Sequence, residues 1–295
     1  MQIVITGGTG FLGSALVTHL RATGHVVSVL TRKPTRQGEI EWNPGRGSAA
    51  LVGALRGADA VVNLAGASLA QRWTKAHKRA LWESRVSLTQ TLVHAMNQVD
   101  PAPRVLVSGS AIGIYGDRGD EPLTETSVVG NDFLASLGTA WEQAALAAGP
   151  RTRTVLLRTG LALERSGGVL PQMALPFRFF AGGPIGSGRQ YLSWIHRDDW
   201  VAMTTWALTN PAVSGPLNAT APEPATNREF TKALGRALHR PAFMPAPGFA
   251  LRVVLGEMAN LILEGQRVLP AKAGELGFRF RYPQLEPALR AICSA

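Results

Sequence analysis

A glycine-rich turn near the start of the chain limits the possible folds more than any other feature. The sequence from residue 3 to 16 reads IVITGGTGFLGSAL, in which a β-branched apolar run leads into glycines at Gly7, Gly8, Gly10 and Gly13 and then into an apolar helical pattern. Such a turn lets backbone N–H groups approach a pyrophosphate without interference from Cβ atoms, and the helix N-terminus adds positive partial charge. Because the motif follows a strand and opens a helix, it favours a dinucleotide-binding βαβ unit over a glycine turn without a ligand.

The end of the second predicted strand indicates which dinucleotide the turn would take. Val26–Leu30 reads as a buried strand, and Thr31, Arg32 and Lys33 follow it. NAD-preferring sites carry an Asp or Glu here, about 20 residues after the glycines, to accept from the ribose 2′-hydroxyl. No acid occupies this place, and Arg32 with Lys33 would instead neutralise a 2′-phosphate. We therefore predict NADP(H) as the cofactor, the alternative being a solvated pair of charges.

The composition is that of a globular chain of enzyme size. Its 295 residues suffice for one or two domains. The sequence has neither an apolar run of the roughly 18 residues needed to span a bilayer nor a secretory signal, so we expect a cytoplasmic protein. A single cysteine, Cys293, excludes an internal disulfide and suits a reducing compartment. No Cys/His cluster has metal-ligand spacing, and we expect no metal site.

The net charge of +10 raises the question of nucleic-acid binding. The basic residues are mostly arginines spread along the chain, and the densest groups, 32–36 and 75–79, do not alternate with stacking aromatics. We therefore expect neither a nucleic acid nor a membrane as partner. We expect a small-molecule substrate, and the same positive charge would attract an anionic one. For the oligomeric state, we expect a monomer or a homodimer.

Strand and helix patterns alternate through the first half of the chain. This alternation favours an α/β fold with a Rossmann-type doubly wound parallel sheet, in which ligands bind beyond the carboxyl ends of the strands. Three strand ends, Thr6–Gly13, Leu64–Gly66 and Ser108–Ser110, carry small residues and would line one crevice, although the second could be only a tight turn. The predicted strands are 3–5, 26–30, 58–66, 104–111 and 153–163, and the predicted helices are 13–23, 51–55, 73–98 and 133–148.

The alternation stops after about residue 164, where a stretch rich in Gly and Pro begins. Tyr191–Leu208 reads as a strand, an N-cap at Asp198 or Asp199 and a helix. Ala225–Leu238 reads as an amphipathic helix with a Thr/Asn cap, and residues 215–220 as a further strand. We predict an NADP-binding Rossmann domain of residues 1–164, to which segments within 191–220 return, and a smaller C-terminal substrate lobe of residues 165–190 and 221–295.

Motifs along nearly the whole chain carry a family resemblance. They include TGGTGFLG (6–13), TRKP (31–34), VNLAGASL (62–69), SGSAIGIYG (108–116), GGPIGSGRQYLSWIHRDD (182–199), APEPATNREF (221–230) and LEGQRVLP (263–270). The chain resembles an extended short-chain dehydrogenase/reductase of the NAD-dependent epimerase/dehydratase superfamily, and within it the atypical subgroup called epimerase family proteins. The resemblance implies a Rossmann domain that holds NADP(H) and a small substrate lobe.

The resemblance also implies which residues contact the nucleotide. Arg85 is one of them, on the long predicted helix, where the alternative is a solvated helix charge. The full predicted set is Gly7, Thr9, Gly10, Phe11, Leu12, Gly13, Thr31, Arg32, Leu64, Ala65, Gly66 and Arg85.

One departure from the superfamily pattern concerns the catalytic pair. Ordinary members carry Tyr-x-x-x-Lys on the helix after the Ser strand, and the lysine depresses the tyrosine pKa so that the phenol can exchange a proton. No tyrosine of this chain is followed by a lysine four residues later. The expected place reads DFLASLGTAWE, with Phe133 or Leu134 where the tyrosine would fall.

Other hydroxyls are the candidates to replace that tyrosine. Ser108 and Ser110 stand at the end of the Ser strand, where relatives place a carbonyl-polarising hydroxyl, and Tyr115 follows in a glycine-flanked loop. Without a nearby lysine, the pKa of Tyr115 should stay near about 10, and its alternative role is packing. His196 would titrate near neutral pH, although local bonding is favoured, and Glu142 is expected to be a structural carboxylate.

Two functions follow from these patterns. The first is an NADP-dependent oxidoreductase or epimerase acting on a small polar carbonyl compound or a sugar- or nucleotide-linked one. The second is a catalytically reduced NADP(H)-binding sensor or regulatory protein. The missing Tyr-x-x-x-Lys pair favours the second, whereas the polar, glycine-rich segment 182–199 favours the first.

Overall fold

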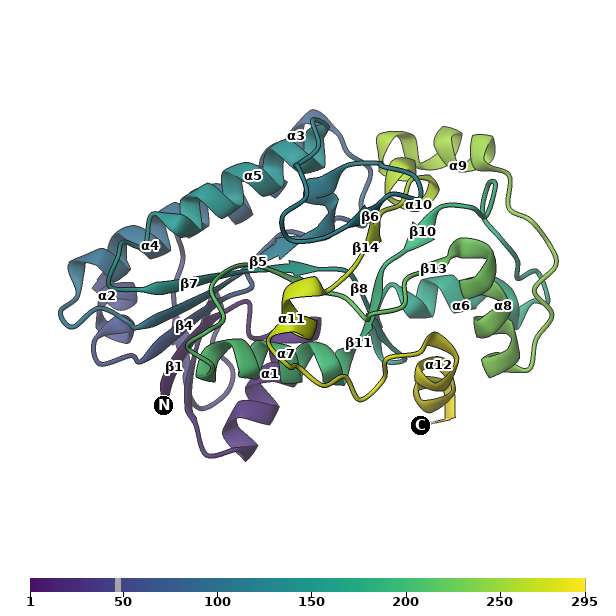
Figure 1. Ribbon diagram of the computed structural model, residues 1–295. Helices are drawn as coiled ribbons and strands as arrows, with labels where there is room; N and C mark the ends of the chain where they lie inside the picture. The colour runs from purple at the N-terminus through teal and green to yellow at the C-terminus, as the bar shows by residue number, and fades with distance from the viewer. Residues whose placement is uncertain (46–48, 295) are drawn as a thin grey trace.

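A seven-stranded parallel sheet forms the centre of the molecule in a computed structural model that describes residues 1–45 and 49–294 (Figure 1). The strand order is β12-β7-β5-β4-β1-β2-β3, and every pair of neighbours runs parallel. The predicted Rossmann-type doubly wound sheet is therefore confirmed. Its strands are β1 (Gln2–Thr6), β2 (Val26–Thr31), β3 (Glu39–Glu41), β4 (Ala60–Asn63), β5 (Val105–Ala111), β7 (Arg153–Thr159) and β12 (Gly215–Ala219).

Helices cover both faces of this sheet, which explains why its strands read as continuous apolar runs. Side chains alternate between the faces along each strand: Ile3 and Ile5 of β1 join one buried cluster, whereas Val4 joins the other. The first cluster packs against α1 (Phe11–Ala22) and α7 (Arg197–Thr209). The second packs against α2 (Ala49–Leu55), α4 (Leu88–Gln98) and α5 (Phe133–Leu146).

A smaller lobe lies beyond the carboxyl ends of the strands, on the right in Figure 1. Its core consists of Leu163, Phe177, Trp194, Phe230 and Leu289 together with their neighbours. Its strand pairings are β8 (Leu161–Glu164) with β9 (Gly167–Gly168) and β11 (Trp194–His196), β10 (Tyr191–Leu192) with β13 (Ala225–Thr226), and β6 (Pro122–Leu123) with β14 (Arg267–Val268). Its helices are α6 (Leu170–Arg178), α8 (Asn227–Leu238), α9 (Gly248–Leu255), α10 (Asn260–Leu263) and α12 (Leu285–Ser294), whereas α11 (Ala271–Glu275) packs against β12 of the large sheet.

The predicted strand 153–163 is wrong at its centre. It divides at Gly160 into β7 of the large sheet and β8 of the lobe. A Cβ on Gly160 would lie 2.3 Å from the backbone oxygen of Ser193. The chain therefore crosses between the two parts at a point where only glycine fits.

One predicted helix has a different course, and another begins after its predicted Thr cap. The predicted helix 73–98 consists of α3 (Lys75–Trp82), a π-helical stretch Glu83–Ser87 and then α4. The predicted helix 225–238 begins at Asn227, because Thr226 is its N-cap and forms a capping box with Glu229.

Residues 191–220 are divided between the large sheet and the lobe. β12 joins the large sheet and α7 packs on it, whereas β10 and β11 pair within the lobe. The predicted N-cap of α7 is wrong: His196 caps it and accepts from the Asp198 N–H at 3.0 Å. Asp199 instead accepts from the backbone N–H groups of Arg281 and Tyr282.

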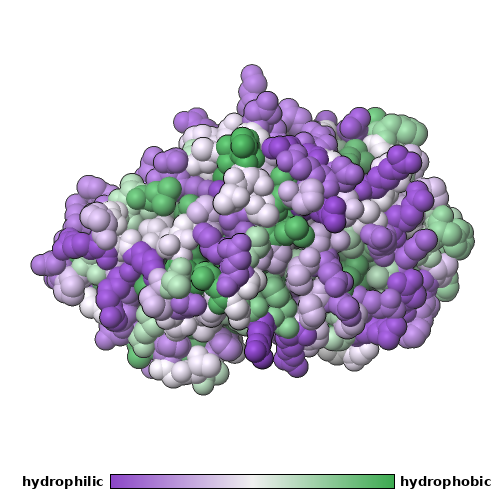
Figure 2. Space-filling view, viewed as in Figure 1, coloured by the Kyte–Doolittle hydropathy of each residue, from purple (hydrophilic) through white to green (hydrophobic). Residues whose placement is uncertain are grey.

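The molecular surface carries both polar and apolar regions (Figure 2). Polar side chains cover most of the face shown, and apolar patches interrupt them. Phe249, Val253 and Val254 of α9 are exposed. No helix within the described ranges has both the length and the apolar character to cross a membrane.

Candidate functional site

The glycine turn between β1 and α1 is closely packed at three of its glycines, and at Gly8 an added Cβ would lie 2.8 Å from the Val29 side chain. Gly7 has a φ of +70°, and a Cβ there would lie 2.6 Å from the backbone carbonyl of Leu64. A Cβ on Gly13 would lie 2.2 Å from the Gly7 oxygen. A Cβ on Gly10 would meet only that same oxygen, at 3.3 Å. The turn is therefore tight at its base and open at Gly10.

The N-terminus of α1 is available to an anion. Its N-cap, Gly10, has no side-chain cap, and no acid stands in the first turn. Thr9 and Gly10 are exposed, and Phe11 and Leu12 are partly exposed. Free N–H groups and the helix dipole at such an end favour negative charge.

The ring of Phe11 lies under the β8–β9 hairpin. A Cβ on Gly167 would come within 2.6 Å of this ring, and one on Gly168 within 2.8 Å. The two glycines let the hairpin backbone approach the start of α1 closely. The smaller lobe therefore borders the glycine turn directly.

The three strand ends with small residues lie side by side, as their sequence positions suggested. Thr6 Oγ1 donates to Asn63 Oδ1 at 2.7 Å and accepts from the Ala65 N–H at 3.3 Å. Asn63 is in register with Ser108 of β5. The ends of β1, β4 and β5 thus share one edge of the sheet, and a buried hydrogen-bonded network joins the first two.

Arg32, which we predicted to bind a 2′-phosphate, lies directly after β2. It follows Thr31, the last residue of β2, and β2 is hydrogen-bonded to β1 just before the glycine turn. Arg32 and Lys33 are exposed. Within the described residues the Arg32 guanidinium has no hydrogen bond or ion pair, so its charge is available to a ligand.

Arg85 is buried, not the solvated helix charge of the alternative interpretation. The π-helical stretch carries it inward, so that only 9% of the residue is exposed. Its Nη2 donates to the Ala67 carbonyl at 3.0 Å, and its guanidinium lies 5.4 Å from the Trp141 ring centre. Burial lowers its pKa to about 10.

The second terminal nitrogen of Arg85 has no partner among the described residues. The guanidinium lies against Gly66, where a Cβ would be 3.1 Å from its carbon. A buried cation with an unused donor is costly unless a ligand satisfies it. Together with the open Gly10 and the uncapped α1, this unused donor fits an anionic nucleotide at the predicted place.

Tyr115 does not lie in the expected loop. It belongs to a short 3₁₀ helix, Ile112–Tyr115, and is fully buried. Its hydroxyl donates to Asn218 Oδ1 at 2.7 Å and accepts from Arg158 Nη1 at 2.9 Å. Burial raises its pKa above the expected value near 10, although Arg158 opposes the shift. Its catalytic role stays a prediction.

The two candidate serines are also buried. Ser110 donates to Glu142 Oε1 at 2.7 Å, and both carboxylate oxygens of Glu142 accept from Arg158 at 2.8 Å. Ser108 accepts a long hydrogen bond of 3.4 Å from Asn63. Glu142 is thus buried and paired with Arg158, as expected of a structural carboxylate. The catalytic roles of the two serines stay predictions.

Sequence reasoning missed the polar residues that surround Tyr115. Glu125 accepts from the Asn218 N–H at 3.0 Å and from the Lys272 N–H at 3.2 Å, and Arg158 joins Tyr115 to Glu142. An arginine inside the apolar run RTVLLRT was a usable signal, because a buried charge requires a partner. Nothing in the sequence indicated Asn218 as its neighbour.

Glu264 was also missed. Partial burial raises its pKa, and the negative charges of Asp117 and Asp132 add to the shift. Asp132 caps the start of α5 by accepting from the Ala135 N–H at 2.8 Å. Glu264 therefore brings a carboxyl group near the N-terminus of α5, where the superfamily carries its tyrosine.

Two family models match the chain. The model described as the NAD dependent epimerase/dehydratase family matches residues 3–136, and a domain of unknown function, DUF1731, matches residues 246–292. Epimerase family protein YfhF of Bacillus subtilis is 42% identical, over 99% of this chain and 98% of that protein.

Solved structures match over the whole chain. The crystal structure of human epimerase family protein SDR39U1 with NADPH has a TM-score of 0.92 and 38% identity, covering 100% of this chain and 99% of that one. A nucleoside-diphosphate sugar epimerase from Corynebacterium glutamicum has a TM-score of 0.83 and 35% identity, covering 99% of this chain and 58% of that one.

Proposed function

Because the chain belongs to the NAD-dependent epimerase/dehydratase family, we propose that it is an NADP(H)-dependent oxidoreductase or epimerase. Its substrate would be a small polar carbonyl compound or a sugar- or nucleotide-linked one. The observation that carries the proposal is the buried Arg85 guanidinium, whose Nη1 has no partner among the residues that the structure describes and lies at the same sheet edge as the glycine turn.

The chain's own residues divide the work of holding the cofactor. The N–H groups at the start of α1 take the pyrophosphate, and Arg32 with Lys33 neutralises the 2′-phosphate. Arg85, which lies against Gly66 and Ala67, donates a hydrogen bond to the nucleotide. The bound nicotinamide supplies hydride transfer. The human relative that was crystallised with NADPH supports this choice of dinucleotide.

Proton transfer at the substrate needs a group that can titrate. Ser108, Ser110 and Tyr115 remain candidates, but each hydroxyl would first have to be uncovered. Glu264 is a further candidate, since its raised pKa suits a carboxyl group that donates and accepts a proton closer to neutral pH.

One observation favours the sensor or regulatory function instead. All three candidate hydroxyls are buried, and that of Tyr115 is fully engaged by Arg158 and Asn218. A protein of this kind would bind NADP(H) tightly and convert nothing.

Metabolite profiling separates these functions. Purified protein with NADP⁺ or NADPH would be incubated with a small-molecule extract, and mass spectrometry would follow the compounds that change. Boiled protein and a Gly10→Val variant serve as controls. A compound whose change requires wild-type protein and nicotinamide supports the enzyme. No change, despite NADPH binding measured by calorimetry, contradicts the enzyme and supports the sensor.

Substituting Arg85 tests the observation on which the proposal rests. Arg85→Met keeps the length and removes the charge, so the NADPH-induced rise in melting temperature should shrink while the unliganded protein stays folded. An undiminished rise would contradict the assignment of Arg85 to the nucleotide.

A further inference from the structure

The β8–β9 hairpin is the part of the smaller lobe that touches the start of α1. A two-residue turn, Arg165–Ser166, joins its strands, and the glycines that follow, Gly167 and Gly168, lie against the ring of Phe11. Phe11 is the first residue of α1, whose free N–H groups are suited to a pyrophosphate. The hairpin therefore holds the side chain of a residue whose backbone belongs to the candidate phosphate site.

The carboxylate of Glu164 closes the turn and joins it to α7. The pairing of β8 with β11 stops one residue before Glu164. Glu164 Oε1 accepts from the backbone N–H groups of Arg165 at 2.7 Å and of Ser166 at 3.4 Å. The other oxygen, Oε2, lies 2.8 Å from Arg197 Nη2. The far end of the hairpin is thus tied to α7 by an ion pair.

Arg197 is the first residue of α7 and is only partly exposed. Its side chain is 27% exposed and that of Glu164 is 16% exposed, and its Nη1 lies 3.5 Å from Ser166 Oγ. Its Nε is buried and has no partner among the residues that the structure describes. An unsatisfied buried donor costs stability, which is expected where a side chain serves a site rather than the fold.

The turn is held from a second side as well. Arg165 Nη1 donates to the Cys293 carbonyl of α12 at 3.4 Å. α12 belongs to the core of the lobe, whereas α7 packs with α1 on one face of the large sheet. The pair between Arg197 and Glu164 is therefore the link from the hairpin to the layer of helices that contains α1.

We propose that Arg197 is a positioning residue for the nucleotide. By tying Glu164 to α7, it keeps the hairpin seated on Phe11 and fixes the N–H groups at the start of α1 in the orientation that a pyrophosphate needs. This inference rests on the proposed NADP(H) site. The effect should appear in the release of NADPH, because changes within one binding site alter dissociation more than association.

The test is the dissociation rate of NADPH, measured by stopped-flow fluorescence after the complex is mixed with excess NADP⁺. Arg197→Gln should release NADPH about tenfold faster, the usual effect of losing a charged hydrogen bond. Glu164→Gln removes the same ion pair from its other side and should have a similar effect. Arg197→Lys restores a cation without the planar fork and should bring the rate back to within about threefold of wild type.

A double-mutant cycle tests the route through Phe11. Phe11→Ala removes the ring on which the hairpin rests and should itself speed the release of NADPH. Adding Arg197→Gln to this variant should raise the rate no further, because the hairpin then has no ring to hold. If Arg197 served folding alone, its substitution would have the same effect in both backgrounds.

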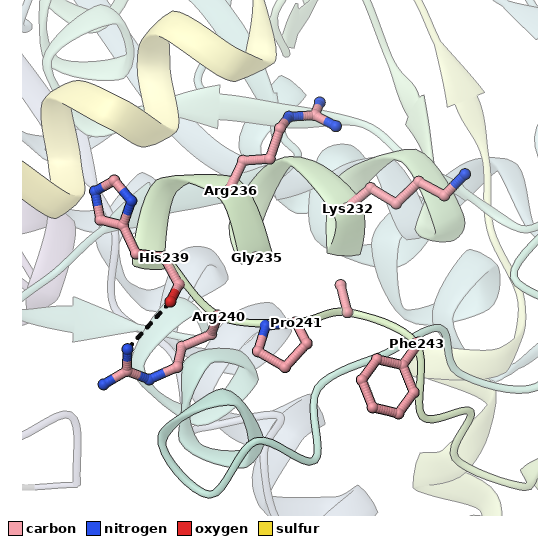
Figure 3. Close-up of a pocket in the computed structure, with 8 residues that line it drawn as sticks. Lys232, Gly235, Arg236, His239, Arg240, Pro241 and Phe243 are labelled. Atoms are coloured by element: carbon pink, nitrogen blue, oxygen red, sulfur yellow. Dashed lines mark hydrogen bonds between the residues drawn. The ribbon is translucent and has the colours of Figure 1, made fainter.

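Arg236→Gln is the matched control within the smaller lobe. Arg236 pairs with Glu286 at 2.9 Å. It extends from α8 on the same side as Lys232 and lines an open hollow of about 650 Å³ (Figure 3). The variant removes an Arg–Glu pair of similar length from the same lobe but leaves the hairpin contacts in place. Its release of NADPH should stay at the wild-type rate.

Several results would overturn the proposal. They are a wild-type release rate in both Arg197→Gln and Glu164→Gln, additive effects in the double-mutant cycle, and an equally fast release in Arg236→Gln. Wild-type protein that does not bind NADPH would overturn the proposed cofactor and this inference with it. Binding of NADPH with a release rate that does not respond to either hairpin variant would overturn this inference alone.

Discussion

Arg158 and Glu142 form a bidentate ion pair in the interior, with both nitrogen–oxygen distances at 2.8 Å. Their side chains are only 5% and 8% exposed. Burial alone would lower the pKa of Arg158, but the hydrogen bonds and charge of Glu142 raise it above its ordinary value. The pair fixes β7 to α5, and through the Tyr115 hydroxyl it reaches Asn218 of β12.

Glu142→Gln should destabilise the protein by about 3–5 kcal/mol, because it leaves the Arg158 charge buried without its counter-ion. Urea unfolding measures the loss. The matched control is Glu121→Gln, which breaks the more exposed Arg118–Glu121 pair and should cost less than about 1 kcal/mol. Equal losses in the two variants would show that burial does not decide the strength of the pair.

The elements that the sequence predicted well have local causes. The glycine turn and the strands β1 and β2 follow from glycine spacing and from apolar runs buried on both faces. The environment of Tyr115 could not be predicted, because its partners Arg158 and Asn218 lie 43 and 103 residues away. Likewise, the break at Gly160 depends on the distant Ser193.

Arg85 shows the same limit at the candidate site. Its place on a helix could be predicted, but its burial depends on the π-helical stretch that turns it inward. The apolar pattern continues on both sides of this stretch, so helical periodicity in the sequence does not reveal the π-helical turn. The resemblance to a family indicated Arg85, whereas the pattern alone suggested a solvated charge.

Arg32→Glu should weaken NADPH binding far more than NADH binding. The substitution places a negative charge where the 2′-phosphate would lie, and NADH has no such phosphate. We expect a loss of at least about 100-fold for NADPH, equivalent to roughly 3 kcal/mol. Fluorescence titration of both nucleotides measures the ratio.

The control for this prediction is Arg56→Glu, an exposed arginine that precedes the amino end of β4, whereas Arg32 follows the carboxyl end of β2. It changes the net charge equally and should leave both affinities nearly unchanged. An equal loss for NADPH and NADH in Arg32→Glu would contradict the assignment of Arg32 to the 2′-phosphate.

Gly10→Val should abolish nucleotide binding in a protein that still folds. Gly10 has a φ of −80°, which valine can adopt, and the nearest atom to an added Cβ lies 3.3 Å away. The side chain would then occupy the space left for the pyrophosphate. Calorimetry with NADPH measures binding, and circular dichroism measures folding.

Two further glycines serve as references for that result. Gly13→Val should unfold the turn, because its Cβ would lie 2.2 Å from the Gly7 oxygen. Gly53→Val in α2 has nothing within 4 Å and should keep both fold and binding. NADPH affinity retained in Gly10→Val would show that the turn is not the phosphate site.

Tyr115→Phe should cost about 1–3 kcal/mol of stability and leave NADPH binding intact. The substitution removes a buried hydroxyl, so Asn218 Oδ1 loses its donor and Arg158 Nη1 loses its nearest acceptor, although Glu142 still pairs with Arg158. Tyr191→Phe is the control, because that hydroxyl has no hydrogen bond within the described residues and lies in the smaller lobe. A 100-fold loss of turnover at unchanged stability would instead support a catalytic role for Tyr115.

His196 should make the protein less stable as the pH falls from about 7 to 5. Burial lowers its pKa, an effect that outweighs the nearby Asp198, Asp199 and Glu164, and its Nδ1 must stay unprotonated to accept from the Asp198 N–H. The unfolded chain takes up a proton near pH 6.5, whereas the folded protein does so only at lower pH. The stability present above pH 6.5 is therefore lost below it, by at most about 1.4 kcal/mol per pH unit.

His196→Asn isolates this contribution, because asparagine keeps an N-cap acceptor for α7 but does not titrate. The variant should lose less stability than wild type between about pH 7 and 5, when urea unfolding is measured across this range. His94→Asn, at an exposed position of α4, should follow the wild-type profile. If His196→Asn followed that profile too, a group other than His196 would have to cause the acid sensitivity.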